Sequence, residues 1–362
     1  MGGILSIDRR QFIETAKKSA GGKEVIAVVK NNAYNYGLEF AVKAFLEAGI
    51  HSFATTSLDE AKSIRTYAPD ALIFMMNPVY DLEAVYKYNL HITLPSLEYY
   101  YKYCGELSGV NVHFEFAGLF NRSGFEDAST MIEVLEHQKS LADDVQMNVK
   151  GIWTHFGYAD ELDMDEYEIE RGMWLDLLNE LSEAGYIFEI VHSQNSASFA
   201  RDGLFDGHTH LRLGISLYGS RPYALLPEED YVQSLELKAK IVQIRNIRAG
   251  QKCGYGGSYA PGFNSKIAIV DIGYGDGVLR KRASFDCLIN GERYSVKSLM
   301  MSHMIVEIDD KVTIQDEVIL YNNEMRIDEF TALGVGANSE QLGALNYQSL
   351  KKVILNDTGI RQ

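Results

Sequence analysis

EVIAVVK, residues 24–30, is an apolar run that ends in a lysine, and it predicts a buried β-strand. The stretch that follows, residues 38–48, places Val42, Phe45 and Leu46 at helical spacing. A strand followed by an amphipathic helix is the first half of a βαβ unit, so the elements farther along the chain decide the fold.

The same alternation continues along the first 230 residues or so. We expect further strands at 51–56, 71–77, 91–96, 111–116 and 186–191, and helices at about 58–67 and 165–184, the latter ended by Gly185. Strands that alternate with helices predict a parallel sheet, and about eight such units fit before residue 230. A (β/α)8 barrel over residues 1–230 is the natural closure, and an open doubly wound sheet is the alternative.

The pattern changes after residue 230. Strands are expected at 234–241, 266–273 and 311–322, and a helix only at 339–345. Asn290-Gly291 lies between two strand-like runs in CLINGERYSV (287–296), which is a strong hairpin signal. Residues 231–362 are therefore predicted to form a second, mainly antiparallel β-domain.

Composition excludes several classes of partner. The chain has 362 residues, of which 46% are apolar, and its formal net charge is −16. The length suits two domains, and the apolar share suits a sizeable core. An acidic chain repels phosphate backbones and anionic lipid surfaces, which argues against nucleic acid and membranes as partners.

The cysteines and the N-terminal residues indicate a reduced, cytoplasmic protein. Cys104, Cys253 and Cys287 are far apart and lack metal-ligand spacing, so neither a disulfide framework nor a metal site is expected. The first residues lack the apolar stretch of a signal peptide. No apolar run approaches the roughly 18 residues that a membrane span needs.

Lys30 is the first candidate for chemistry. Catalytic groups of α/β barrels lie at the C-terminal ends of strands, and Lys30 follows the strand expected at 24–29. A lysine at that place is partly desolvated, which lowers its pKa and makes its amine nucleophilic. The alternative is a lysine that extends from the strand end into solvent, and on position alone this alternative is the commoner one.

The surrounding residues change that balance. In AVVKNNAYNYG (27–37), Asn32 and Tyr34 follow the lysine by two and four residues, and this segment resembles the cofactor-lysine signature of the alanine racemase family, whose members depend on pyridoxal 5′-phosphate (PLP). Further matching segments follow in the family's order: GIWTHFGYAD (151–160), VHSQNSAS (191–198), LRLGISLYG (211–219), CGYGGSY (253–259), DIGYGDGVLR (271–280) and ALNYQSLKK (344–352). The resemblance covers about nine-tenths of the chain and is that of a divergent member.

The resemblance implies a fold, an assembly and a reaction. The fold is a (β/α)8 barrel followed by a β-domain, and the assembly is a homodimer with active sites shared between subunits. Lys30 would carry PLP as a Schiff base and act as the base on one face of the substrate's α-carbon. Tyr255 of the partner subunit would act on the other face, so the enzyme would interconvert L- and D-amino acids, first of all alanine. A phenol is a weak base at neutral pH and needs nearby positive charge, for which His155 and Arg212 are the candidates.

The resemblance also assigns the groups that bind the cofactor. His155 would lie beside PLP, and Arg212 would face its pyridine nitrogen. A guanidinium does not readily give up a proton, so the ring would be a weaker electron sink and simple reprotonation would be favoured. The phosphate would be bound by side chains or backbone amides of Tyr34, Ser196, Gly214, Ile215 and Tyr347. Ser196 is also a candidate helix N-cap, a role compatible with phosphate binding.

Three residues are assigned to the substrate. Arg122, in FEFAGLFNRSGF (114–125), would bind the amino acid's carboxylate, assisted by the backbone amide of Met301. Tyr274 would line the substrate entrance.

The chain departs from the family at two places. Glu115 stands where many members have a carbamylated, and so negatively charged, lysine; a glutamate supplies a similar charge directly and could orient Arg122. The family's usual cysteine, methionine and aspartate are here Met300, Met301 and Ser302. The loss of a carboxylate and a thiol near the pocket leaves alanine, serine and longer amino acids open as substrates.

Two other classes of function remain as alternatives. A barrel-type PLP decarboxylase shares this architecture, but such enzymes place a carboxylate at the pyridine nitrogen, where this chain has Arg212. A PLP-binding protein without turnover would need only Lys30, so the presence of Tyr255 speaks against it.

Overall fold

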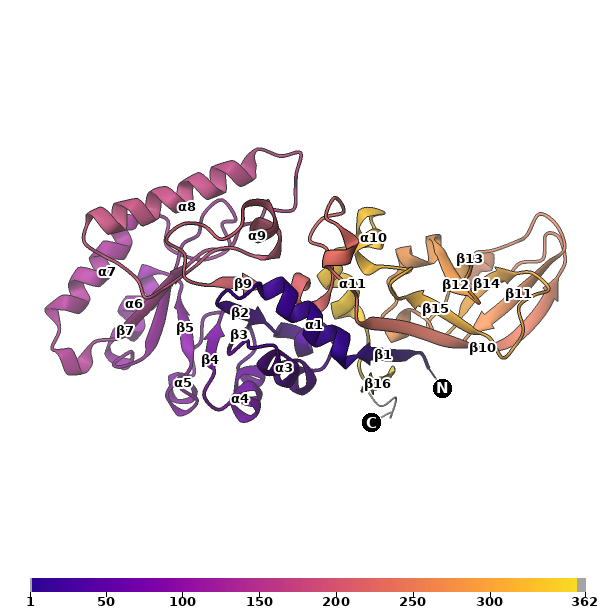
Figure 1. Ribbon diagram of the computed structural model, residues 1–362, viewed down its shortest axis with the longest axis horizontal. Helices are drawn as coiled ribbons and strands as arrows, with labels where there is room; N and C mark the ends of the chain where they lie inside the picture. Colours follow the sequence, from indigo (N-terminus) through magenta and orange to yellow (C-terminus); the bar gives the residue numbers. More distant parts are fainter. Residues whose placement is uncertain (1, 357–362) are drawn as a thin grey trace. The chain divides into compact units, whose positions relative to one another are not determined.

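The computed structural model describes residues 2–356, which form two compact units (Figure 1). We call residues 20–217 the barrel unit, and residues 2–19 together with 218–356 the β-unit. The sequence predicts a boundary at residue 230 and assigns the first residues to the barrel. The contacts differ at both points. Residues 218–230 belong to the β-unit, and so do residues 2–19, because the strand near the N-terminus pairs with strands of that unit.

Eight parallel strands form the sheet of the barrel unit. In pairing order they are β8 (Ile190–His192), β7 (Asn148–Trp153), β6 (Asn111–Glu115), β5 (His91–Leu94), β4 (Leu72–Met75), β3 (Ser52–Thr55), β2 (Val25–Val28) and β9 (Leu211–Leu213). Backbone hydrogen bonds join the two ends of this order, from Thr209 N to Val191 O at 3.1 Å and from Arg212 N to Gln194 O at 3.0 Å. The sheet is thus a nearly closed barrel, which confirms the predicted class over the open doubly wound alternative.

Helices follow the strands of this sheet. They are α2 (Lys30–Tyr34), α3 (Leu38–Glu47), α4 (Leu58–Tyr67), α5 (Leu82–Lys87), α6 (Leu97–Tyr103), α7 (Ala128–Ser140), α8 (Glu166–Glu183) and α9 (Ser196–Asp202), with short 3-10 turns at Cys104–Glu106, Asp143–Val145 and Ile215–Tyr218. The side chains of Ser57, Asp81, Ser96 and Asp127 each accept a hydrogen bond from the backbone N–H three residues on. These caps begin α4 to α7 and so fix the length of the loops at the C-terminal ends of the strands.

The barrel interior contains many polar groups. Beside the buried rings of Phe74 and Trp153, the strands contribute buried polar side chains: Thr93, His113, Glu115, His192 and Arg212. Parallel strands covered on both faces are usually apolar, and buried polar groups need hydrogen-bond partners. The interior is therefore organised by hydrogen bonds as well as by apolar packing.

The β-unit is built on a second sheet of eight strands. In pairing order they are β11 (Ser265–Val270), β14 (Met304–Ile308), β13 (Glu292–Leu299), β12 (Asp286–Ile289), β15 (Glu317–Tyr321), β10 (Leu235–Ile247), β1 (Ile4–Asp8) and β16 (Lys351–Leu355). The pairings are antiparallel except that of β1 with β16. The unit also contains α1 (Arg9–Ala20), α10 (Ile327–Ala332), α11 (Asn338–Ala344) and 3-10 turns at Glu228–Asp230, Tyr255–Gly257, Tyr274–Asp276 and Arg280–Ser284. This sheet confirms the predicted mainly antiparallel β-domain.

The predicted elements differ from the observed ones in detail. Asn290 and Gly291 have φ angles of 52° and 79° and form the turn of the β12–β13 hairpin, as predicted. Residues 186–189 and 311–316 lie outside strands, and α10 is a helix that the sequence did not indicate. The first error has a simple reason: β8 pairs with β7 only from Ile190 onward, so the apolar residues before it have no ladder to join.

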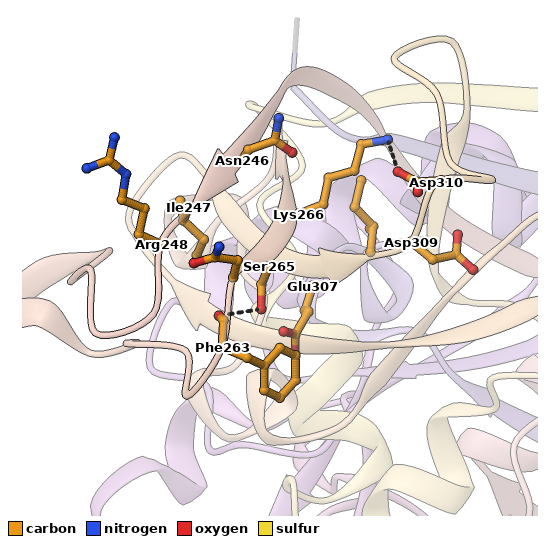
Figure 2. A pocket seen from close by; sticks show the side chains of 11 residues that line it. Asn246, Ile247, Arg248, Phe263, Ser265, Lys266, Glu307, Asp309 and Asp310 are labelled. Atoms are coloured by element: carbon orange, nitrogen blue, oxygen red, sulfur yellow. Dashed lines mark hydrogen bonds and ion pairs between the residues drawn. The ribbon is translucent and has the colours of Figure 1, made fainter.

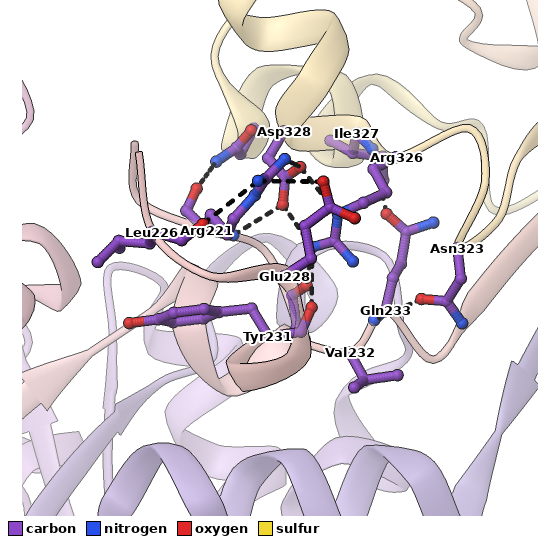
Figure 3. A network of polar contacts seen from close by, with 12 residues as sticks. Arg221, Leu226, Glu228, Tyr231, Val232, Gln233, Asn323, Arg326, Ile327 and Asp328 are labelled. Atoms are coloured by element: carbon purple, nitrogen blue, oxygen red, sulfur yellow. Dashed lines mark hydrogen bonds and ion pairs between the residues drawn. The ribbon is translucent and has the colours of Figure 1, made fainter. Parts of the chain in front are cut away.

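A buried ion cluster fixes the long connection that precedes β10 (Figure 3). Asp328, near the start of α10, accepts hydrogen bonds from Arg326 Nη2 at 2.6 Å and from Arg221 Nη2 at 2.9 Å. Arg326 Nη2 also donates to the carbonyl oxygens of Gly219 and Tyr231, at 3.2 and 2.8 Å. The cluster thereby ties both ends of the connection between residues 219 and 231 to one carboxylate.

Two kinds of feature are absent from residues 2–356. None of their helices is long and apolar enough to cross a membrane. Nor do their histidine, cysteine and acidic side chains gather in a group that could hold a metal ion.

Candidate active site

Lys30 lies two residues beyond Val28, the last residue of strand β2, and so at the C-terminal end of the barrel, as the sequence predicts. The side chain is half-buried. Burial, together with the nearby charges of Arg122 and Arg212, lowers the pKa of Lys30 below its ordinary value. The amine is therefore neutral, and so nucleophilic, in a larger share of molecules than an exposed lysine would be.

The backbone after Lys30 forms a left-handed turn. Asn31, Asn32, Ala33, Tyr34 and Asn35 all have φ between 51° and 63°, a region that costs an L-residue roughly 1–2 kcal/mol but that asparagine tolerates best. This local chemistry explains the NNAYN sequence. The turn places Lys30 and Tyr34 on one short segment that follows β2.

Two side chains hold the turn in place. Glu60, on α4, accepts a hydrogen bond from Asn32 N at 2.7 Å and another from the Thr55 hydroxyl. Asn32 Oδ1 accepts from Leu38 N, the first residue of α3, at 2.8 Å. The strained turn is thus supported from both neighbouring helices.

Arg212 lies in the middle of β9 and is almost completely buried. Its Nη2 donates to Thr154 O at 2.8 Å and to His155 Nδ1 at 3.1 Å, and its Nη1 donates to His192 Nδ1 at 3.0 Å. Burial and the charge of Arg122 lower the pKa of Arg212 to about 9, while Glu115 opposes the shift, so the guanidinium stays charged at neutral pH. Burial, and then the charge of Arg212, holds the pKa of His155 well below its usual range.

A cluster of hydroxyl groups and backbone amides lies beside Tyr34. Ser196 Oγ is 2.9 Å from Ser216 Oγ, and it accepts hydrogen bonds from Gly214 N at 3.2 Å and Ser216 N at 3.3 Å. A Cβ atom at Gly214 would come within 2.8 Å of the Tyr34 hydroxyl, so only glycine leaves room there. Burial raises the pKa of Tyr34, which keeps its hydroxyl a donor.

The N-cap of α9 is Asn195 and not Ser196. Asn195 Oδ1 accepts from Ala197 N and Ser198 N, both at 3.0 Å, and Ser198 Oγ returns a bond to Asn195 N. Ser196 therefore occupies the first helical position, and its hydroxyl takes part in the cluster with Gly214 and Ser216. Ile215 begins the 3-10 turn that follows Gly214.

Arg122 and Glu115 form the polar pair that the sequence predicts. Arg122 Nη2 is 3.8 Å from Glu115 Oε1, and the carboxylate also accepts from Ser123 Oγ at 2.6 Å and Thr93 Oγ1 at 3.0 Å. Glu115 is only 2% exposed, and burial raises its pKa despite these hydrogen bonds and the charges of Arg122 and Arg212. The guanidinium of Arg122 also lies 4.9 Å from the centre of the Phe120 ring.

The barrel unit thus brings together most of the predicted site residues. The charges of Arg122 and Arg212 lower the pKa of Lys30 and of His155, that of Arg122 lowers the pKa of Arg212, and both arginines act on Glu115. The remaining predicted residues, Tyr255, Tyr274, Met301 and Tyr347, belong to the β-unit and are described within it.

Tyr255 lies on an exposed loop of the β-unit, and its side chain is 64% exposed. Gly254, with φ of 75°, precedes it, and Ser258 Oγ lies 2.8 Å from Ser298 Oγ, which ties the loop to strand β13. Beside the tyrosine is a pocket of about 290 Å³ that Arg280 and Lys297 also line.

The other three residues lie on adjoining loops. Tyr274 N and Gly275 N donate to the carbonyl oxygens of Met300 and Met301, at 3.0 and 2.8 Å. Asn346, the residue before Tyr347, donates from its side chain to Gly275 O at 3.0 Å. Tyr274, Met301 and Tyr347 therefore stand on three segments that hydrogen bonds join.

A larger pocket of the β-unit lies apart from these residues. Its volume is about 820 Å³, and it opens between the ends of β10, β11 and β14 (Figure 2). Phe263, 71% exposed, and the ion pair of Lys266 with Asp310 lie on its wall. None of the predicted site residues lines this pocket.

The sequence did not single out several residues that support the site. Glu60 holds the left-handed turn, Trp153 lies against Arg212 at 4.8 Å, and His192 accepts a hydrogen bond from that arginine. A signal that could have revealed such residues is the alternation of side chains along a strand, which places His113 on the same face of its strand as Glu115. That signal is weak in a barrel, because both faces of each strand are buried.

Comparisons with known proteins agree with this geometry. The family model of the alanine racemase N-terminal domain matches residues 10–222, and that of the C-terminal domain matches residues 234–353. Alanine racemase 2 of Staphylococcus aureus strain COL is 52% identical over 357 residues, which cover 97% of this chain and 98% of that protein. Alanine racemase of Ligilactobacillus salivarius is 28% identical and covers 88% of this chain and 87% of its own length.

Solved structures support the fold. Alanine racemase from E. faecalis superposes with a TM-score of 0.87 over 98% of both chains at 24% identity. Alanine racemase from Bacillus anthracis gives 0.85 over 99% of this chain and 96% of the other at 23% identity. The two family models together span most of the chain, and a relative of nearly equal length shares half of its residues. The chain therefore belongs to the alanine racemase family.

Proposed function

We propose that this protein is a PLP-dependent alanine racemase that works with two bases, Lys30 and Tyr255 of the partner subunit. The observation that carries the proposal is the polar array at the C-terminal end of the barrel. There, a lysine with a lowered pKa shares its surroundings with Arg212 and Arg122, and hydroxyl groups and backbone amides gather around Ser196 and Gly214. The relatives named above, which are alanine racemases, support alanine as the substrate.

The residues present fit PLP. Ser196, Tyr34 and the amides of Gly214 and Ile215 would supply the donors to a phosphate, and the Tyr34 hydroxyl approaches Gly214 so closely that a Cβ atom there would come within 2.8 Å of it. We assign Tyr347 to the same phosphate. Arg212 would face the pyridine nitrogen, with His155 beside the ring. When bound, PLP supplies the electron sink that makes an amino acid's Cα–H bond acidic.

Lys30 would hold the cofactor through its Nζ and exchange protons with one face of the α-carbon. Its lowered pKa suits both tasks, because a nucleophile and a base must each be neutral before they act. The positive charges of Arg122 and Arg212, which lower that pKa, disfavour the ammonium form of the side chain.

Tyr255 of the partner subunit would serve the opposite face of the α-carbon. The high exposure of Tyr255 in a single chain, on a loop tied down by Ser258, supports a role at a surface that meets a second copy. We therefore propose a homodimer with shared sites.

Arg212 would decide which reaction follows proton removal. A guanidinium offers hydrogen bonds and charge but no readily transferred proton, so the pyridine nitrogen would stay unprotonated. Charge would then remain near the α-carbon, where a proton returns to it from Lys30 or from Tyr255 of the partner subunit. The same argument disfavours transamination, in which the proton would return to the cofactor and not to the α-carbon.

Arg122 would bind the carboxylate of the amino acid, assisted by the amide of Met301, while Tyr274 would line the entrance. Glu115 would hold Arg122 in place, since it supplies a fixed negative charge 3.8 Å away from a buried position. Ser302, which lies 2.9 Å from His303 Nδ1 through its hydroxyl, stands where the family usually has a carboxylate.

The test is incubation of the protein with PLP and single L-amino acids in deuterium oxide, followed by chiral analysis and measurement of deuterium at Cα. We expect D-alanine to form with deuterium at Cα, and other amino acids to react more slowly. A faster reaction of serine would change the substrate. Release of carbon dioxide would favour a decarboxylase, and PLP binding without any deuterium exchange would favour a protein without turnover.

Three variants assign the roles. Lys30→Ala should abolish the absorbance of covalently held PLP. Tyr255→Phe should slow deuterium exchange of one alanine enantiomer far more than that of the other. Tyr259→Phe is the matched control, because this tyrosine of the same segment donates to Glu307 at 2.9 Å and has no assigned role. Equal, small effects of Tyr255→Phe on both enantiomers would contradict the two-base mechanism.

A further inference from the structure

A chain of histidines crosses the interior of the barrel unit. His91 Nδ1, at the start of β5, is 2.9 Å from His113 Nε2, in the middle of β6. His113 Nδ1 is 3.0 Å from His192 Nε2, at the end of β8, and His192 Nδ1 is 3.0 Å from Arg212 Nη1. The chain therefore runs from the N-terminal end of the strands to the arginine assigned to the cofactor.

The arginine determines the direction of every hydrogen bond in this chain. A guanidinium has donors and no acceptor, so His192 Nδ1 must accept, and a neutral ring that accepts at Nδ1 carries its proton on Nε2. His192 Nε2 then donates to His113 Nδ1, and by the same step His113 Nε2 donates to His91 Nδ1. All three rings are thereby fixed as the Nε2–H tautomer.

The same hydrogen bonds also keep the three rings neutral. A charged imidazole carries protons on both nitrogens, and a second proton on any ring would face another N–H. Burial lowers the pKa of His91 to about 4, and it holds those of His113 and His192 well below their usual range. The charged or titratable groups that act on the three rings from the neighbouring elements, besides the members of the chain, are Arg65, Lys150, Glu189, His208 and His210.

The fold makes room for the chain. A Cβ atom at Gly151, on β7, would lie 2.6 Å from His113 Nδ1, so the ring fits only beside a glycine. The register between β6 and β7 shifts at His113, which pairs with Gly151. The ring of Phe74 packs against both His113 and His192, with centroids 4.7 and 5.1 Å apart.

We propose that His91 and His113 are positioning residues: His113 holds the ring of His192 through the hydrogen bond that its Nδ1 accepts, His91 holds His113 in the same way, and His192 in turn holds Arg212 in one orientation. The chain holds Nη1 of Arg212 while Thr154 O and His155 hold Nη2, so the guanidinium does not rotate. Its direction also blocks proton transfer from the far end of the barrel, because a proton placed on His91 Nδ1 would meet the Nε2–H of His113. The consequence for catalysis rests on the proposed function; the tautomers do not.

The direct test is ¹⁵N NMR of the PLP-loaded protein with ¹⁵N-labelled histidine, since protonated and bare ring nitrogens have distinct shifts. We expect His91, His113 and His192 to be neutral Nε2–H tautomers at pH 7. His208 is an internal control of opposite kind, because its Nε2 accepts from Trp174 Nε1 at 2.8 Å and its proton must be on Nδ1. A charged ring, or an Nδ1–H tautomer at His113 or His192, would overturn the proposal. The same spectrum of the PLP-free protein tests the tautomers even if racemisation fails.

Paired substitutions test the positioning role. Asparagine at 113 keeps an oxygen near the Nδ1 position to accept from His192, whereas leucine of similar size removes it. We expect His113→Leu to change the ¹⁵N shift of His192 and lower kcat on the order of tenfold with KM nearly constant, and His113→Asn to restore most of kcat. Equal behaviour of the two variants, or a rise in KM in place of the fall in kcat, would contradict the proposal.

Two further variants complete the design. His137→Asn, at a histidine of α7 whose Nδ1 bonds the Tyr100 hydroxyl outside the chain, should leave kcat and the His192 shift unchanged. If His113→Leu does not fold, His91→Asn is tested in its place. It should change the ¹⁵N shift of His113 and lower kcat by less than is expected for His113→Leu. An unchanged His113 shift in that variant would also contradict the chain.

Discussion

The negative charge of Glu115 would help to bind the substrate through Arg122, but it also destabilises the folded protein. Its folded-state pKa is raised above the ordinary glutamate value by burial, so it favours folding only when protonated at low pH, and that contribution is lost as pH rises. When its carboxylate is ionised, the buried charge lowers the free energy of unfolding. The same charge lies 3.8 Å from Arg122 and would hold that guanidinium in place.

Glu115→Gln should therefore raise the KM for alanine about tenfold, a loss of about 1.4 kcal/mol, and leave kcat nearly unchanged. Its free energy of unfolding at pH 7 should be no lower than that of the wild type. Steady-state kinetics and urea titrations measure the two quantities. Glu170→Gln is the control, since Glu170 binds the amides of Gly157 and Tyr158 and has no assigned role. A KM that does not change would show that Arg122 is held by other groups.

Individual residues differ in how well the sequence reveals them. Lys30 was identifiable because a lysine ending an apolar strand is seen in the sequence itself, and its companion motifs carried the rest. His91, His113 and His192 were not, since their partners come from four separate strands and adjacency in a barrel is not visible in a linear pattern. Ser196 was assigned a possible capping role that belongs to Asn195, because two polar residues in a row both satisfy the cap preference.

At the scale of the element, the left-handed turn after β2 invites a paired experiment at Asn32. Alanine and glycine at this position both remove the hydrogen bond to Leu38 N, but only glycine accepts φ of 53° without strain. Asn32→Ala should therefore be less stable than Asn32→Gly by about 1 kcal/mol, and it should hold PLP more weakly. Chemical denaturation and titration with PLP would measure both. Equal stability of the two variants would mean that the turn relaxes.

The elements themselves were largely predictable. Strands β2 to β6 and helices α3, α4 and α8 lie where apolar periodicity places them, within a few residues. The sequence-based predictions were wrong at two places. Residues 186–189 are partly apolar but have no neighbouring strand with which to pair, and α10 has too few residues to show a helical period. The first strand, β1, has five residues and no helix–strand signal that would assign it to the β-unit.

At the scale of the whole molecule, the ion cluster around Asp328 should set part of the resistance to acid. Burial alone would raise the pKa of Asp328, but hydrogen bonds from Arg326 and Arg221 outweigh it and lower the pKa below its ordinary value. A lowered carboxylate pKa stabilises the folded state above the unfolded-state pKa of about 3.9, and this contribution is lost as pH falls through the folded-state value.

Asp328→Asn should lower the free energy of unfolding at pH 7 by about 3 kcal/mol, because the buried guanidinium of Arg326 loses its counter-charge and that of Arg221 keeps only the exposed Glu228. As the pH falls below the unfolded-state pKa of about 3.9, the difference from the wild type should shrink, because the wild-type carboxylate itself becomes protonated. Urea titrations across this pH range would test both statements. Asp310→Asn, in an exposed pair with Lys266, should show neither effect. A difference that does not depend on pH would contradict the role of the charge.

The proposed sharing of sites between subunits predicts a specific result for mixed dimers. Lys30→Ala and Tyr255→Phe should each be inactive alone, as each removes one base from every site. After the two proteins are unfolded together and refolded, half of the dimers carry one intact site of two, so about a quarter of wild-type activity should return. Mixing without subunit exchange is the control. If each site used residues of one chain only, no activity would return.

Strand β1 has a consequence for how the molecule is made. A ribosome produces Ile4–Asp8 long before its parallel neighbour, Lys351–Leu355. Residues 20–217 carry all eight strands of their own barrel and can complete it during synthesis, while β1 waits with both edges unpaired until β10 and then β16 emerge. Nascent chains halted before residue 351 should therefore contain a finished barrel and an open β-sheet, the state in which this protein most needs protection from aggregation.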